Sequence, residues 1–154
     1  MKILVVYYSR SGNTKKAAEE ISKDLKCDID EISENKSRKG MIGWLGAGRD
    51  AMRKKEVEIK FEKDLSKYDL IIVGTPIWAS TAVPAVRSYL IKNQDKLKSK
   101  KIAFFSTSGG TRIDRVAEDM EKLSEKPIAT LSLFAKGNNL EKIKDFCEKV
   151  KSKK

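Results

Sequence analysis

The sequence predicts an α/β fold: a doubly wound, five-stranded parallel sheet between two layers of helices, in a three-layer sandwich. Apolar and β-branched runs alternate along the chain with segments whose apolar residues recur at helical spacing. The runs at 2–8, 70–74 and 101–107 are apolar almost throughout, which is typical of strands buried on both faces of a parallel sheet. Helices between such strands form right-handed crossovers, so we expect them to cover both faces.

Each element is predicted from its own local pattern. The strands are expected at 2–8, 28–32, 70–74, 101–107 and 128–134. The helices are expected at 14–25, about 84–93, about 113–123 and 140–150. Ala17 and Ile21 lie on the apolar stripe of the first helix, and Pro84 suits the first turn of the second. The basic tail at 149–154 is expected to be frayed and solvated.

One segment breaks the alternation of strands and helices. Residues 36–55 combine apolar residues, basic residues and glycines between the second and third predicted strands. We favour an amphipathic crossover helix with a glycine-rich start. A lid over a ligand and a contact with a membrane surface are the alternatives, because the segment is both apolar and basic.

Length and composition restrict the class of protein. At 154 residues the chain is expected to form one domain, 1–154. It contains no histidine, which excludes His-based acid–base catalysis, Ser-His-Asp chemistry and most zinc sites. No apolar run is long enough to span a membrane, and the first strand begins too early to leave room for a signal peptide. Cys27 and Cys147 are expected to be buried free thiols, so the predicted location is the reducing cytoplasm.

The turn between the first strand and the first helix is rich in hydroxyl groups. Residues 9–14 read Ser-Arg-Ser-Gly-Asn-Thr, and Gly12 permits a positive φ angle and the close approach of a ligand. The start of a helix offers unpaired N–H groups and partial positive charge, so this turn is suited to hold a phosphate. The alternative is an ordinary connection in which Ser11 or Asn13 caps the helix. The turn lacks the lysine of a P-loop and the three glycines of a dinucleotide fold.

Two further turns are expected at the same edge of the sheet, beyond the carboxyl ends of the strands. Residues 74–81 follow the third strand and read Gly-Thr-Pro-Ile-Trp-Ala-Ser-Thr. Residues 106–111 follow the fourth strand and read Ser-Thr-Ser-Gly-Gly-Thr. Trp78 is expected at a loop tip beside the phosphate turn, where its ring is available to stack on a flat ligand.

Together these three segments resemble the motifs of the flavodoxin family, in its short form, over nearly the whole chain. Residues 8–14 resemble the family's phosphate loop, 75–78 the loop whose aromatic residue covers one face of the flavin, and 106–110 the loop on its other side. The resemblance implies non-covalent FMN and the strand order 2-1-3-4-5. The implied FMN-binding residues are Ser9, Arg10, Ser11, Gly12, Asn13, Thr14, Thr75, Pro76, Ile77, Trp78, Ala79, Ser106, Thr107, Ser108, Gly109 and Gly110. No catalytic residue and no metal site is expected.

The chain departs from the family pattern at several positions. Arg10, Lys15 and Lys16 place cations in and after the phosphate loop, and the third loop has no aromatic residue. Ala79 and Ser80 stand where the family often has a glycine. That glycine eases a peptide flip that stabilises one-electron-reduced flavin. We therefore expect this state to be only modestly stabilised here.

The net charge of +11 also differs from the family's typically acidic electron carriers. A positive surface suits an acidic redox partner, or a phosphorylated substrate such as a nicotinamide nucleotide. Nucleic acid is disfavoured as a partner, because the lysines are scattered among acids and no ladder of aromatic and basic residues appears. The expected function is electron transfer between redox proteins on FMN. The alternative is an NAD(P)H-dependent reductase of quinones or other small molecules. Nothing in the sequence indicates an oligomeric state.

Overall fold

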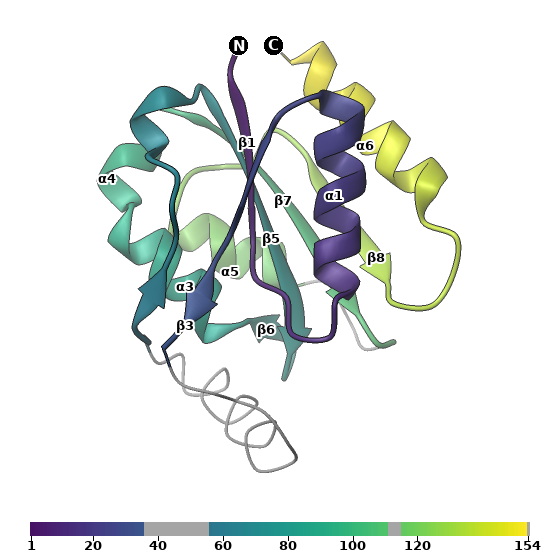
Figure 1. Ribbon diagram of the computed structural model, residues 1–154, viewed down its shortest axis with the longest axis horizontal. Coiled ribbons are helices and arrows are strands. Elements are labelled where there is room, and N and C mark those ends of the chain that lie inside the picture. Colours follow the sequence, from purple (N-terminus) through teal and green to yellow (C-terminus); the bar gives the residue numbers. More distant parts are fainter. Residues whose placement is uncertain (36–55, 111–114, 154) are drawn as a thin grey trace.

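The computed structural model describes residues 1–35, 56–110 and 115–153, and it is built around a parallel sheet (Figure 1). The strands lie side by side in the order β2 (Asp28–Glu31), β1 (Ile3–Tyr7), β5 (Leu70–Trp78), β7 (Lys101–Ser108) and β8 (Thr130–Phe134). All neighbours along this path are parallel. Counted along the chain without the two-residue strands, the order is 2-1-3-4-5, so the predicted fold class and strand order are confirmed.

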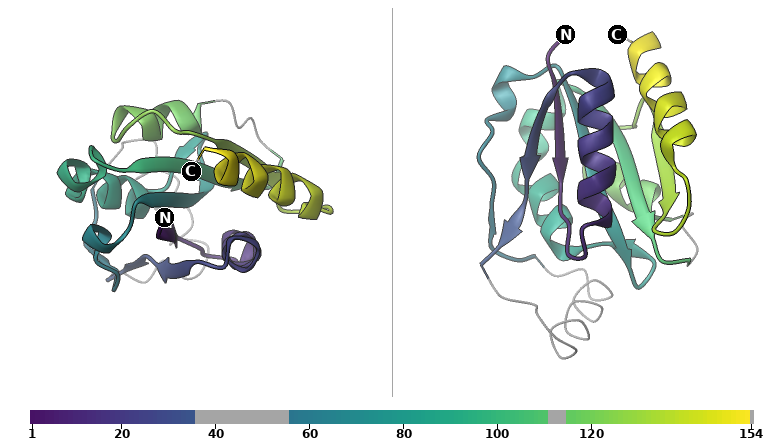
Figure 2. Two further views of the ribbon diagram at one scale, coloured as in Figure 1. Left: turned by 90° about the horizontal axis from the view of Figure 1, so that it is seen from above. Right: turned by 45° about the vertical axis from the view of Figure 1, so that its right-hand side comes forward.

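Helices cover both faces of the sheet. They are α1 (Asn13–Leu25), α3 (Pro84–Lys92), α4 (Gln94–Leu97), α5 (Val116–Lys122) and α6 (Leu140–Ser152). Figure 1 shows α1 and α6 side by side in front of the sheet, with α3 and α5 behind it, and Figure 2 shows the layers from two further directions. The remaining short elements are β3 (Ser33–Glu34), β4 (Ile59–Lys60), β6 (Thr81–Ala82) and the 3-10 helix η1 (Leu65–Lys67).

The central strands are buried on both faces, as their continuous apolar sequences predict. Leu4 and Val5, successive residues of β1, are fully buried in two different core clusters. Val5 packs in the cluster that contains Ile21 of α1 and Phe146 of α6, whereas Leu4 packs in the cluster that contains Tyr89 of α3. Because side chains alternate along a strand, each residue of β1 serves one layer only.

Gly74 in the middle of β5 is required by packing. A Cβ atom built there would lie 2.0 Å from the ring of Phe105, its partner residue on β7. Any larger residue would push this ring out of a close-packed core. The glycine therefore allows the Phe105 ring to lie directly against β5.

The predicted end of the third strand is wrong. We expected the strand to end at Gly74, but β5 continues through 75–78, pairing with β7 and then, antiparallel, with β6. Thr75 and Pro76 are residues typical of a turn when only the local sequence is considered. Pairing of 75–76 with β7 and of 77–78 with β6, which local sequence does not reveal, extends the strand instead. The short elements β3, β4, β6, α4 and η1 were not predicted, because they are too short to show a hydrophobic period.

The ends of the predicted elements differ in other places too. The expected crossover helix or lid at 36–55 and the first residues of the expected helix at 113–123 lie outside the described residues. The expected solvation of the tail at 149–154 is confirmed at Lys149 and at 151–153, which are exposed. The expected fraying is wrong for 149–152, since α6 continues to Ser152 and the Lys151 ammonium lies 2.6 Å from the Asp24 carboxylate. This ion pair joins the last helix to α1.

Both cysteines are free thiols, as predicted. Cys147 is buried and Cys27 is half-buried. Burial raises the pKa of Cys27 to about 11 and that of Cys147 to about 12, so both remain protonated near neutral pH. Within the described part of the chain, no helix is both long and apolar enough to cross a membrane.

Candidate functional site at the carboxyl edge of the sheet

The three segments singled out by sequence meet at one edge of the sheet. They follow or complete the neighbouring strands β1, β5 and β7, as residues 9–14, 75–81 and 106–110. The N–H of Tyr8 donates to the carbonyl of Gly74 at 3.2 Å, which joins the first segment to the second. Tyr7 and Gly74, and likewise Gly74 and Phe105, thus pair on adjacent strands although they are far apart in the sequence.

The first segment ends in a helix terminus that no side chain caps. Gly12 is the N-cap of α1, with φ of +95°, and no side chain of the described residues hydrogen-bonds to the first turn. The N–H of Gly12 donates to Ser9 Oγ at 3.1 Å, and Asn13 Nδ2 donates to Ser11 Oγ at 3.2 Å. The alternative in which Ser11 or Asn13 caps the helix is therefore wrong. The N–H groups of the first turn remain available to an anion.

A buried hydrogen bond ties the first segment to the third. Thr14 Oγ1 and Thr107 Oγ1 are 2.7 Å apart, and either hydroxyl can donate. The two residues are 1% and 6% exposed, so this bond is shielded from water. Pairing two buried hydroxyls avoids the cost of leaving either one unsatisfied. These two predicted site residues thus act on each other, across the 93 residues that separate them.

The glycines of the first and third segments face open space. A Cβ at Gly12, Gly109 or Gly110 would have no heavy atom within 4 Å. Nearby, Asn13 and Thr107 line a hollow of about 280 Å³ that extends towards the connection between β8 and α6. The backbone of both segments is therefore accessible to a ligand at close range.

Trp78 lies in a hairpin rather than at the tip of an irregular loop, which corrects the expectation. It pairs antiparallel with Thr81 of β6, so that only Ala79 and Ser80 form the turn. Its ring is half-buried and meets the ring of Tyr8 edge-on, with centroids 5.7 Å apart and an interplanar angle of 87°. The guanidinium of Arg10 lies 5.9 Å from the Trp78 ring centroid. The aromatic ring of the second segment is thus in contact with the first.

The turn at Ala79 and Ser80 is strained. Their φ angles are +49° and +62°, the combination that a type I′ hairpin turn requires. Such turns usually contain asparagine and glycine, because the left-handed region costs other residues about 1–2 kcal/mol each. Both residues are exposed, so packing around their side chains does not enforce this conformation.

The third segment is more regular than predicted. Ser106, Thr107 and Ser108 belong to β7 and are all buried, so they form the end of a strand rather than a loop. Beyond them the N–H of Gly110 donates to Ser108 Oγ at 3.2 Å, and Gly109 and Gly110 are exposed. Only the two glycines of this segment present their backbone fully to solvent.

The family model for flavodoxins matches residues 2–150. The chain belongs to the flavodoxin family. The expected family is confirmed, and FMN, the cofactor expected from the sequence, is the cofactor of this family.

Solved structures of flavoproteins share this flavodoxin fold. A flavoprotein from Lactobacillus acidophilus NCFM in complex with FMN is 22% identical, with a TM-score of 0.75 over 94% of this chain and 97% of that one. A putative flavoprotein from Bacteroides uniformis is 24% identical, with a TM-score of 0.78 over 96% and 97%. The two-electron reduced flavodoxin of Megasphaera elsdenii is 20% identical, with a TM-score of 0.64 over 98% and 99%. No curated protein sequence matches the chain.

The residues at the carboxyl edge of this flavodoxin fit FMN by their chemistry. The first segment combines an open helix terminus with hydroxyl groups and the guanidinium of Arg10, which together form a donor set suited to a phosphate. The second supplies the half-buried indole of Trp78 for a flat ring, and the third supplies Gly109 and Gly110 with open space around them. These donors and the ring are arranged around one edge, as a ligand with a phosphate at one end and an aromatic ring at the other requires.

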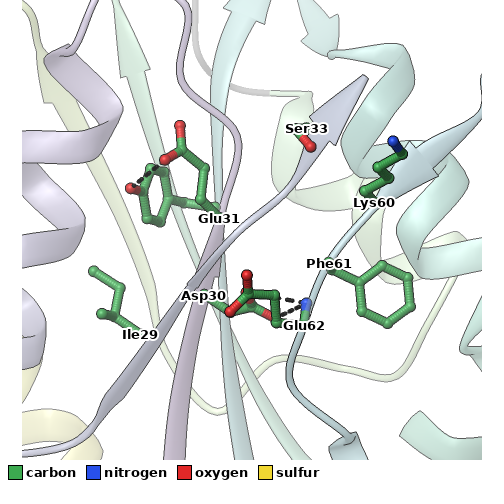
Figure 3. Close-up of a pocket in the computed structure, with 8 residues that line it drawn as sticks. Ile29, Asp30, Glu31, Ser33, Lys60, Phe61 and Glu62 are labelled. Carbon is green, nitrogen blue, oxygen red and sulfur yellow. Dashed lines mark hydrogen bonds between the residues drawn. The ribbon is translucent and has the colours of Figure 1, made fainter. Parts of the chain in front are cut away.

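A separate hollow of about 510 Å³ opens at the β2 edge of this flavodoxin (Figure 3). The Asp30 carboxylate there accepts hydrogen bonds from the backbone N–H groups of Glu62, at 3.0 Å, and Lys63, at 2.7 Å. These bonds fasten the segment after β4 to β2. Asp30, Glu31 and Glu62 outnumber Lys60 among the charged residues that line the hollow, so its charge opposes a phosphate. None of the predicted FMN-binding residues lines it.

The sequence did not single out Tyr8 as a site residue, although it lies within the first motif. The sequence predicts Tyr8 as the last residue of the first strand, and its side chain is buried in the structure. The same ring nevertheless contacts Trp78 at the start of the first segment. The available signal was its position directly before Ser9, at the end of a buried strand.

Proposed function

We propose that this flavodoxin-family protein holds FMN non-covalently at the carboxyl edge of the sheet and uses it to transfer electrons between redox proteins. The observation that carries the proposal is the uncapped N-terminus of α1, which opens beside a hydroxyl-rich turn and within reach of the segment that bears Trp78. When bound, the flavin accepts and donates electrons. The protein binds it, orients it and sets its potential.

In this proposal each segment has its own part in binding. The backbone and hydroxyl groups of 9–14 hold the phosphate, with Arg10 adding positive charge. Residues 75–79 form one side of the ring site, with Trp78 against the face of the isoalloxazine, and 106–110 form the other side. Thr14 and Thr107 fix the distance between the phosphate and ring sites through their buried hydrogen bond.

Discrimination between FMN and riboflavin tests the proposed cofactor site. Each hydrogen bond to a charged phosphate contributes about 1.5–3 kcal/mol, so several such bonds should make FMN bind far more tightly than riboflavin. Calorimetric titration of the apoprotein with both flavins measures the difference. Equal affinities would contradict the assignment of 9–14 as the phosphate segment.

A second function is favoured by two observations. The net charge of +11 suits a nicotinamide nucleotide as well as an acidic protein, and Ala79 and Ser80 disfavour the stabilised one-electron state on which single-electron carriers depend. The alternative is therefore an NAD(P)H-dependent reductase of quinones or other small molecules. Electron transfer between proteins is preferred because the chain belongs to the flavodoxin family.

Adding NADPH to the FMN-loaded protein distinguishes the two functions. A carrier should show no bleaching of the flavin absorbance with NADPH alone on the timescale of turnover. A reductase should bleach with NADPH and recover when a quinone is added. We place either activity in the cytoplasm, which is supported by the two free thiols.

A further inference from the structure

The hairpin that carries Trp78 is anchored from outside by a partly buried carboxylate. Thr81, the residue paired directly with Trp78, donates a hydrogen bond through Oγ1 to Oδ2 of Asp119 on α5. Thr81 is 6% exposed and the Asp119 side chain 13% exposed. The bond links residues 38 positions apart, and it joins the second segment of the site to the helix that follows the third.

Asp119 is itself faced by a buried cation. Arg87 of α3 places Nη1 3.9 Å from Asp119 Oδ2, and its side chain is 9% exposed. The geometry is loose for a buried ion pair, and Arg87 Nε is buried without a hydrogen-bond partner in the described structure. Two charges removed from water in this way are a poor source of net stability, because desolvation offsets their attraction. The pair is therefore better explained by what it holds in place.

What it holds is the strained turn. Ala79 and Ser80 adopt positive φ angles without the glycine or asparagine that would favour them, and their exposed side chains make no core contact that would enforce the conformation. A conformation of this kind persists when its surroundings determine it. The hydrogen bond from Thr81 fixes one end of the two-residue turn, and the pairing of Trp78 with Thr81 transmits this restraint to the indole.

We propose that Asp119, oriented by Arg87, is a positioning residue that sets the place of Trp78 at the flavin through Thr81. The inference rests on the proposed function, because it requires Trp78 to contact the flavin. Neither Asp119 nor Arg87 belongs to a segment that resembles a flavin loop. Their effect on the flavin is indirect, through the hairpin.

The test is Thr81→Val in the full-length, FMN-loaded protein. This change removes the hydroxyl with little change of shape and leaves the Asp119–Arg87 pair intact. We expect it to weaken FMN binding at least fivefold, to change the visible circular dichroism of the bound flavin and to shift its midpoint potential. Thr81→Ser keeps the hydroxyl. Its FMN affinity should lie within twofold of that of the unmodified protein, and its circular dichroism spectrum and midpoint potential should be unchanged. Asp119→Ala should have a larger effect on affinity, at least tenfold.

A double-mutant cycle separates positioning from general destabilisation. If Asp119 and Thr81 act through the indole, Thr81→Val should change FMN affinity less than twofold in a Trp78→Ala background. Asp24→Asn, which breaks the ion pair with Lys151 between α1 and α6, is the control. It should lower the melting temperature without changing the flavin spectrum or potential.

The outcomes distinguish this inference from the proposed function. If Trp78→Ala weakens FMN binding but Thr81→Val does not, the inference is overturned and the function stands. Equal effects of Thr81→Val with and without Trp78 also overturn it, since the residue would then act independently of the indole. If Trp78→Ala leaves FMN affinity unchanged, the assigned flavin contact fails and the inference fails with it.

Discussion

The two segments at the centre of the candidate site solve the problem of a left-handed backbone in opposite ways. At the phosphate turn, Gly12 adopts φ of +95° with open space where its Cβ would be. At the hairpin, Ala79 and Ser80 adopt +49° and +62° although both have side chains. A left-handed conformation costs glycine little, whereas at Ala79 and Ser80 it depends on contacts with residues distant in the sequence. Local sequence therefore determines the turn at 9–14, whereas tertiary contacts determine the hairpin at 77–82.

The two segments also differ in the groups that they offer to a ligand. The phosphate turn leaves a helix terminus uncapped, so its binding capacity lies in the backbone. The hairpin presents one large side chain, Trp78, that is already half-buried against Tyr8 and beside Arg10. Side-chain substitutions should thus change ligand binding more at the hairpin. Substitutions that restrict the backbone should change ligand binding more at the turn.

The largest effect is expected for Trp78→Ala. Loss of the stacked indole should weaken FMN binding by about 2 kcal/mol, roughly thirtyfold, because an aromatic pair combines a large buried area with specific ring contacts. The flavin potential should become less negative, since stacking on an electron-rich ring disfavours the reduced anion. Fluorescence titration and a redox titration measure the two quantities. An unchanged Kd and potential would place Trp78 away from the flavin, and the hairpin would then be only structural.

A smaller effect is expected for Gly12→Ala. The new methyl group meets no neighbour, so the cost is that of a positive φ angle in a residue with a Cβ, about 1–2 kcal/mol. The melting temperature should fall, and FMN should bind more weakly because the turn and the first N–H groups of α1 move together. Gly109→Ala is the matched control for the melting temperature, since this glycine also has open space around it and has no positive φ angle. Equal losses of melting temperature in both variants would show that strain at Gly12 is not the cause.

The smallest effect is expected for Ser80→Gly, and its sign is opposite. Glycine removes the left-handed penalty at one turn position and should stabilise the protein by about 1 kcal/mol. It should also increase the fraction of one-electron-reduced flavin seen during photoreduction, which we expect to be modest in the unmodified protein. Thermal unfolding and the visible spectrum during photoreduction report these changes. A near-complete yield of this state in the unmodified protein would contradict the argument and strengthen the case for a one-electron carrier.

Much of the fold follows from local pattern. The apolar runs of β1 and β7 and the helical spacing in α1 and α6 are long and regular, and each matches its predicted position closely. The carboxyl edge could likewise be predicted, because the ends of neighbouring parallel strands share one edge. The failures concern places where another strand or helix decides the conformation. Residues 75–78 read as a loop but pair with β6 and β7, and the tail at 149–152 reads as frayed but continues α6 and is joined to α1 by an ion pair.

The sequence by itself determined the α/β class, the three segments of the candidate site and the glycine at the start of α1, because each depends on neighbouring residues and on hydrophobic periodicity. Only the tertiary structure decided how those segments meet. The hydrogen bond between Thr14 and Thr107 and the contact of Thr81 with Asp119 join residues that share no local pattern. Such contacts form only once the sheet has brought distant strands together, since the entropy of closing long loops must first be offset by core packing. The conformation of the hairpin that carries Trp78 is therefore a property of the folded chain.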